Sequence, residues 1–65
     1  MITVRVTPGD RVLTFDRLNT VLQLLNKLGL GMTDALVARE GVLLTPDRKL
    51  RRGDELTVRV VVSRG

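Results

Sequence analysis

One segment of helical periodicity lies between two groups of strand-like segments, and this order leaves few topologies open. The apolar residues that follow the i, i+3, i+4, i+7 spacing of an amphipathic helix are Val21, Leu24, Leu25 and Leu28. Asn19 or Thr20 can cap the start of this helix, with Leu18 as a hydrophobic staple before the cap. Gly29 predicts its end, because glycine enters the left-handed conformation at low cost, and Leu30 can then pack back on the last turn.

Five segments have the composition of β-strands. They cover residues 2–6, 11–15, 35–39, 42–44 and 56–62. Pro8-Gly9-Asp10 predicts a turn that joins the first two into a hairpin, and Glu40-Gly41 predicts the same for the next two. Leu50 is expected to return to the core before a tight turn at Arg52-Gly53-Asp54.

The last and longest of these strands shows strict alternation. Its core-facing residues are expected to be Leu56, Val58, Val60 and Val62. In the second strand the same rule places Leu13 and Phe15 on the core side, whereas Val12 and Thr14 face the other way. Each strand therefore has one buried and one open side.

The order of elements predicts a β-grasp, the α+β fold of ubiquitin. A strand hairpin, a helix and later strands cannot all be antiparallel neighbours, so the helix acts as a crossover that lets the last strand run parallel to the first. We expect a mixed sheet of four to five strands with one helix packed on one face. Residues 1–62 form the predicted domain and residues 63–65 a flexible C-terminal tail.

The sheet face that lacks the helix is expected to be open to solvent or to a partner. The residues predicted to lie there are Thr3, Arg5, Val37, Arg39, Thr57, Arg59 and Val61. Guanidinium groups among small apolar side chains suit protein recognition, because arginine combines planar hydrogen bonding with an apolar stem. An ordinary solvated sheet surface is the alternative interpretation.

The residue types exclude most catalytic chemistry. The chain has no cysteine and no histidine, which removes disulfides, thiolate and imidazole metal ligands, thiol nucleophiles and the usual general base. Its seven carboxylates are scattered without the spacing of a catalytic pair. We therefore expect a protein that is not an enzyme and binds no cofactor or metal. Without a signal-peptide pattern or a long apolar run, a cytoplasmic location and no membrane partner are expected.

The net charge of +4 makes acidic partners plausible. A basic cluster of Arg48, Lys49, Arg51 and Arg52 could bind phosphates, dock an acidic protein, or simply be solvated. Proteins that bind single-stranded nucleic acid stack bases on aromatic side chains, and Phe15 is the only aromatic residue in this sequence. A protein partner is therefore favoured over nucleic acid.

Three segments occur in an order that resembles the ThiS/MoaD-type ubiquitin-like sulfur carriers and the small archaeal modifiers. They are Asn19-Thr20-Val21-x-x-Leu24-Leu25-x-x-Leu28-Gly29-Leu30, Leu36-Val37-Ala38-Arg39-Glu40-Gly41, and Leu50-Arg51-Arg52-Gly53-Asp54-Glu55-Leu56. The resemblance extends over the whole chain and includes the terminal glycine, Gly65. Members of this family end in Gly-Gly, whereas Arg64 precedes Gly65 here, so either Arg is accepted at that position or a further glycine follows Gly65.

The resemblance implies that Gly65 is the reactive residue of a tail formed with Ser63 and Arg64. In the family, an adenylating enzyme of the ubiquitin-activating type uses ATP and Mg²⁺ to convert the glycine carboxylate into an acyl-adenylate. A persulfide or cysteine thiol then attacks, which yields a thiocarboxylate or thioester. The implied acceptors are a sulfur-accepting synthase, a thiolation enzyme or target-protein lysines. Thiamine, molybdopterin or tungstopterin, thiolated tRNA and protein conjugates all stay open as products.

Two other functions remain compatible with the residues. One is a nucleic-acid-binding module that uses the basic cluster together with Arg5, Arg39 and Arg59. The other is an interaction domain with no chemistry at its tail. Both are distinguished from a carrier by whether function survives removal of residues 63–65.

Overall fold

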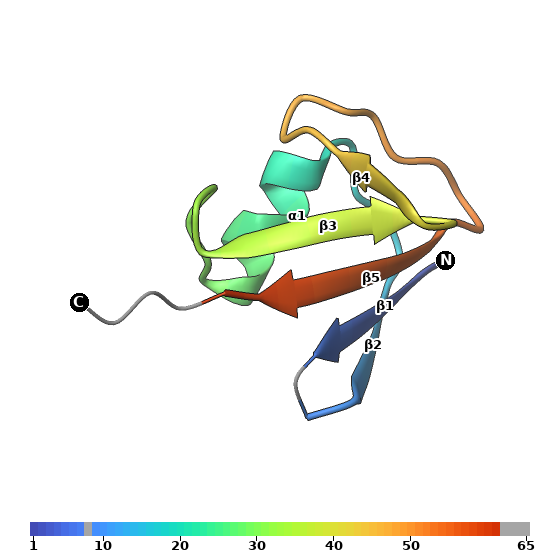
Figure 1. Cartoon of the computed structure of the whole chain (residues 1–65). Coiled ribbons are helices and arrows are strands. Elements are labelled where there is room, and N and C mark those ends of the chain that lie inside the picture. The colour runs from blue at the N-terminus through green and yellow to red at the C-terminus, as the bar shows by residue number, and fades with distance from the viewer. Residues whose placement is uncertain (8, 62–65) are drawn as a thin grey trace.

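The computed structural model of the chain describes residues 1–7 and 9–61. Its elements, in chain order, are β1 (Ile2–Thr7), β2 (Arg11–Phe15), α1 (Val21–Leu28), β3 (Ala35–Arg39), β4 (Val42–Leu44) and β5 (Glu55–Val60). Figure 1 shows these strands as one twisted sheet crossed by the helix. The predicted positions of the strands and of the helix are confirmed, and no predicted boundary differs from the observed one by more than two residues.

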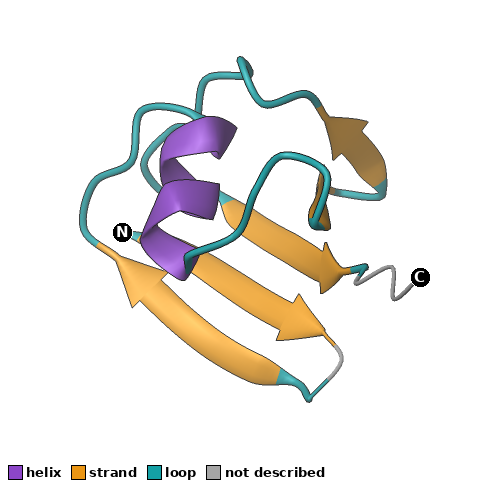
Figure 2. Cartoon of the chain, turned by 90° about the vertical axis from the view of Figure 1, so that its left-hand side faces the viewer, coloured by secondary structure: helices purple, strands orange, loops and turns teal. Residues whose placement is uncertain are grey.

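The sheet has the strand order β2-β1-β5-β3-β4. β1 and β5 are parallel, with Val4 opposite Leu56 and Val6 opposite Val58, whereas the other neighbouring strands are antiparallel. Figure 2 shows the helix across one side of the sheet, with no described segment over the other side. This mixed sheet with a crossover helix on one face confirms the β-grasp-like α+β fold.

Both ends of α1 are closed by local hydrogen bonds. At the start, the Thr20 hydroxyl accepts a hydrogen bond from the Gln23 backbone N–H, and the Gln23 side chain accepts one from the Asn19 N–H. At the end, Gly29 has a φ of 74°, and the Leu30 N–H donates to the Leu25 carbonyl over 2.9 Å. This is the Schellman arrangement predicted from Gly29 and Leu30.

The core lies between α1 and the covered face of the sheet. Its buried residues are Ile2, Val4, Leu18, Val21, Leu24, Leu25, Ala35, Val37, Leu50, Leu56 and Val58. Most of the predicted core positions in the helix and the last strand are thus confirmed, and so is the return of Leu50. Leu28 and Val60 are only partly buried, and Val62 lies outside the described residues. No helical segment in the part of the chain that is described has the length and hydropathy needed to traverse a lipid bilayer.

The predicted orientation of β3 was wrong. Val37 is 3% exposed and packs in the core, because it lies opposite the buried Val58 on β5. Arg39 has the same orientation as Val37, and its guanidinium pairs with Asp54 beside the turn before β5 rather than lying on the open face. The residues of β3 that point to the open side are Leu36 and Ala38.

The last strand is also shorter than predicted at its end. It stops at Val60, although the Val61 N–H still donates to the Asp34 carbonyl over 2.7 Å, in register with the pairing of β5 and β3. Val62 and the predicted tail lie outside the described residues.

Strands β3 and β4 are joined by the two-residue turn Glu40-Gly41, with Arg39 paired to Val42. Both turn residues have positive φ, 54° for Glu40 and 80° for Gly41. A two-residue hairpin turn of this kind matches the twist of the strands, and Asn-Gly is its preferred sequence. Glu40 therefore occupies a conformation that glutamate rarely adopts.

We expect Glu40→Asn to raise the free energy of unfolding by roughly 0.5 kcal/mol, since asparagine recovers part of the roughly 1–2 kcal/mol that a left-handed residue costs. The matched control is Gly41→Ala, which should lower stability by about 1 kcal/mol. Urea unfolding measures both changes. A hairpin with another turn geometry would leave both variants at the stability of the parent protein.

Candidate protein-binding surfaces

The open face of the sheet consists of side chains aligned in rows across the strands. Strand register places Arg5 of β1 between Val12 and Thr57, and Ala38 between Thr57 and Leu43. Neighbouring side chains in such a row lie about 5 Å apart, close enough to form one surface. This first row therefore runs across all five strands.

A second row lies beside the first. It contains Arg59 of β5, flanked by Thr7 on β1 and Leu36 on β3. Arg59 is exposed, and Leu36 is 47% exposed although it is a large apolar residue. Guanidinium groups thus alternate with exposed apolar side chains in the middle of the sheet, the composition expected of a surface that binds protein.

The structure brings most of the predicted open-face residues together. Arg5, Thr57 and Arg59 are exposed on adjacent central strands, and Thr3 is half-buried beside them. Val61 is 45% exposed just after β5. Val37 and Arg39, as described above, do not belong to this face.

Three apolar residues of this face were missed by sequence reasoning. They are Leu36, Ala38 and Leu43. The segments Ala35–Arg39 and Val42–Leu44 are apolar at nearly every position, so alternation gives no signal for which side is buried. The buried side of β3 is set by the pairing of Val37 with Val58, and this pairing is known only once the register of β3 against β5 is known.

Arg39 belongs to a second surface at the β4 edge of the sheet. Its Nη1 donates to Asp54 Oδ2 over 2.9 Å, and the same carboxylate oxygen accepts the Arg51 backbone N–H over 2.8 Å. The turn is closed further by the Asp54 N–H, which donates to the Arg51 carbonyl. One partly buried carboxylate therefore fixes both the Arg39 side chain and the turn before β5.

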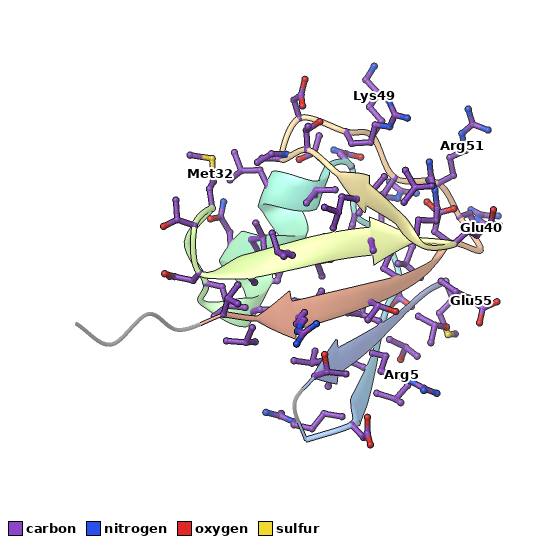
Figure 3. All side chains as sticks on the ribbon, in the orientation of Figure 1. Arg5, Met32, Glu40, Lys49, Arg51 and Glu55 are labelled. Atoms are coloured by element: carbon purple, nitrogen blue, oxygen red, sulfur yellow. The ribbon has the colours of Figure 1, made fainter. Side chains whose placement is uncertain are left out.

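The predicted basic cluster is divided by the fold. Arg48, Lys49 and Arg51 line one hollow of about 500 Å³ beside Arg39, whereas Arg52 lines a different hollow near the start of the chain. Figure 3 shows Lys49 and Arg51 projecting outward at the same end of the molecule. The basic cluster in the structure therefore contains three of the four predicted residues, Arg48, Lys49 and Arg51.

Asp47 is the one carboxylate that lines the hollow of Arg48, Lys49 and Arg51 among the described residues. A hydrogen bond from the Thr45 hydroxyl, assisted by Asp47's own backbone N–H and the charge of Arg48, lowers the pKa of Asp47. Asp47 therefore stays ionised at neutral pH and cancels part of the positive charge. The hollow remains basic.

The reactive residue implied by the family resemblance, Gly65, lies outside the described residues together with Ser63 and Arg64. Within residues 1–7 and 9–61, no three Asp, Glu, His or Cys side chains are grouped as metal ligands would be.

Comparison with known proteins adds no family to this description. No protein-family model matches the chain, and no curated protein matches its sequence.

We expect Asp54→Ala to lower the free energy of unfolding by about 1 kcal/mol, because it removes two charge-assisted hydrogen bonds of a partly exposed group. Asp16→Ala, which also removes one exposed negative charge, is the matched control and should change stability by less than about 0.5 kcal/mol. Thermal unfolding at low and high salt measures the difference. Equal effects in the two variants would contradict the role given to Asp54.

Proposed function

We propose that this protein is a ubiquitin-like carrier or modifier that works through the carboxylate of Gly65. The support comes from the β-grasp-like fold, from the resemblance to ThiS/MoaD-type carriers, and from the place of β5 in the sheet. An adenylating enzyme is the proposed first partner. The acceptor is a sulfur-accepting or thiolation enzyme, or a lysine of a target protein, in the cytoplasm.

The position of β5 is the observation that carries this proposal. This strand lies in the middle of the sheet, between β1 and β3, and the chain continues from it through Val61 toward Gly65. Arg59 and Thr57, on the same strand, face the open side of the sheet. An enzyme that holds this face would therefore also lie beside the segment that leads to Gly65.

The proposed chemistry places few demands on the carrier itself. A carboxylate oxygen of Gly65 attacks the α-phosphorus of ATP and releases pyrophosphate; a thiol or persulfide of the enzyme then attacks the acyl carbon, and AMP leaves. A thiol gives the thioester directly, whereas a persulfide gives an acyl disulfide, which a second enzyme thiol cleaves to the thiocarboxylate as it forms a disulfide with the first cysteine. Glycine suits a narrow active site because it has no side chain next to the reacting carbon. ATP, Mg²⁺ and the thiol or persulfide belong to the partner, which agrees with a carrier sequence that lacks cysteine and histidine.

Activation requires Gly65 to have a free carboxylate. With an adenylating enzyme from the same host, the protein should support exchange of labelled pyrophosphate into ATP, because formation of the acyl-adenylate is reversible. A variant extended by one alanine after Gly65 keeps the described domain and should lose this exchange. Exchange that is equal for both proteins would reject Gly65 as the reactive residue.

The open face should determine how tightly the enzyme holds its carrier. We expect Arg59→Glu to lower kcat/KM for activation by about tenfold or more, mainly through KM, because the substitution reverses a charge in the middle of the face. Arg17→Glu makes the same charge change at an exposed position outside the sheet and is the matched control. If both variants lose activity equally, the net charge of the protein, and not the open face, determines how it binds the adenylating enzyme.

A further inference from the structure

An apolar cavity opens between α1 and the β4 edge of the sheet. It has a volume of about 280 Å³, and its lining includes Leu25 of the helix, Met32, Leu36, Leu43 and Pro46. β4 pairs with residues 37–39 of β3, so the beginning of β3 has no β4 residue opposite it. The cavity lies where this part of the sheet edge is left uncovered.

The mouth of this cavity carries large apolar side chains that stay exposed. Met32 is 59% exposed. Leu36 and Leu43, which line the cavity and also border the open face at this edge, are 47% and 64% exposed. Side chains that line a concave site and stay accessible are available to bury an apolar group of a partner. The volume of the cavity exceeds that of one large side chain, so the cavity can admit a bulky apolar group of a partner.

The basic hollow of Arg48, Lys49 and Arg51 directly adjoins the apolar cavity. Thr45, the residue after β4, lines both. Figure 3 shows Met32 on one side of this region and Lys49 and Arg51 on the other. Among the described residues the one ion pair joins Arg39 to Asp54, which leaves Arg48, Lys49 and Arg51 available for charges supplied from outside.

The loop that carries these charges is fixed to the start of α1 by backbone hydrogen bonds. The Leu22 and Val21 N–H groups donate to the carbonyls of Pro46 and Arg48 over 2.9 Å and 3.0 Å, and the Leu50 N–H donates to the Asn19 carbonyl over 2.8 Å. These bonds satisfy N–H groups that a helix start otherwise leaves unpaired. The cavity and the basic hollow are thus held in a constant relation, which lowers the entropic cost of binding.

We propose that the β4 edge is a docking site for an extended peptide segment that carries one or two bulky apolar residues close to a run of acidic residues. The apolar side chain enters the cavity lined by Leu36 and Leu43, and the carboxylates lie against Arg48, Lys49 and Arg51. Charge complementarity specifies the acidic run, and the apolar cavity specifies the neighbouring residue. This proposal does not depend on Gly65 or on the function proposed above.

A nucleic acid could also use the basic hollow, but the rest of the site does not suit it. Bases need aromatic platforms, and Phe15, the only aromatic residue of the sequence, is partly buried against the core. An aliphatic cavity instead suits an aliphatic or aromatic side chain of a peptide. A peptide and an oligonucleotide can therefore be distinguished by measuring which of them binds this site more tightly.

The probes are two capped peptides, Gly-Leu-Phe-Gly-Asp-Glu-Asp-Glu and its reverse order, because the structure leaves the direction of the bound chain open. We expect either peptide to shift the backbone NMR signals of residues 35–37 and 43–51 in the ¹⁵N-labelled full chain. Peptides with Ser in place of Leu and Phe, or with Lys in place of the acids, should bind at least about tenfold more weakly. A thymidine oligonucleotide of equal charge serves as the competing occupant.

Two exposed substitutions test the two halves of the site without touching the core. Leu43→Ser and the double change Lys49→Glu with Arg51→Glu should each weaken peptide binding by about tenfold or more. Val12→Ser and Arg17→Glu change exposed residues remote from the β4 edge and serve as controls; they should leave the affinity for the peptide unchanged. The proposal is overturned if neither peptide shifts these signals, if the control variants lose as much affinity, or if the oligonucleotide binds more tightly than both peptides.

Discussion

The parallel pairing of β1 with β5 is the constraint on which the rest of the molecule depends. It aligns Val4 with Leu56 and Val6 with Val58 at the centre of the sheet, and Val4 and Val58 are fully buried. Parallel neighbours need a crossover, so α1 must cover one face. The same pairing leaves the other face without a helix and directs the chain from β5 toward Gly65. Core, open face and exit of the chain are therefore consequences of one arrangement.

Local rules were sufficient for the parts of this fold that have local causes. Gly29 and Leu30 gave the end of the helix, and alternation gave the buried side of β5, because both depend on near neighbours in the sequence. The orientation of β3 could not be obtained in this way. Nearly every residue of that strand is apolar, so only its register against Val58 decides that Val37 is buried and Leu36 is exposed. The division of the basic cluster, with Arg52 apart, likewise follows from how the turn before β5 is closed by Asp54.

The two surfaces differ in chemistry and in position, which allows them to serve different partners. The open face carries Arg5 and Arg59 over the central strands. The β4 edge combines an apolar cavity with the charges of Arg48, Lys49 and Arg51. Leu36 and Leu43 contribute to both surfaces, so a large partner on one would restrict access to the other. For the carrier proposed above, such competition would release one enzyme before the next one binds.

The proposal that the chain acts through Gly65 is tested most directly by the intact mass of the protein purified from its own host. The account predicts a species that ends in glycine and carries sulfur in place of one oxygen of its carboxyl group, or a conjugate joined through that glycine to a lysine. A chain that ends in another residue, or one that ends in glycine with an unmodified carboxylate and forms no conjugate, would contradict it.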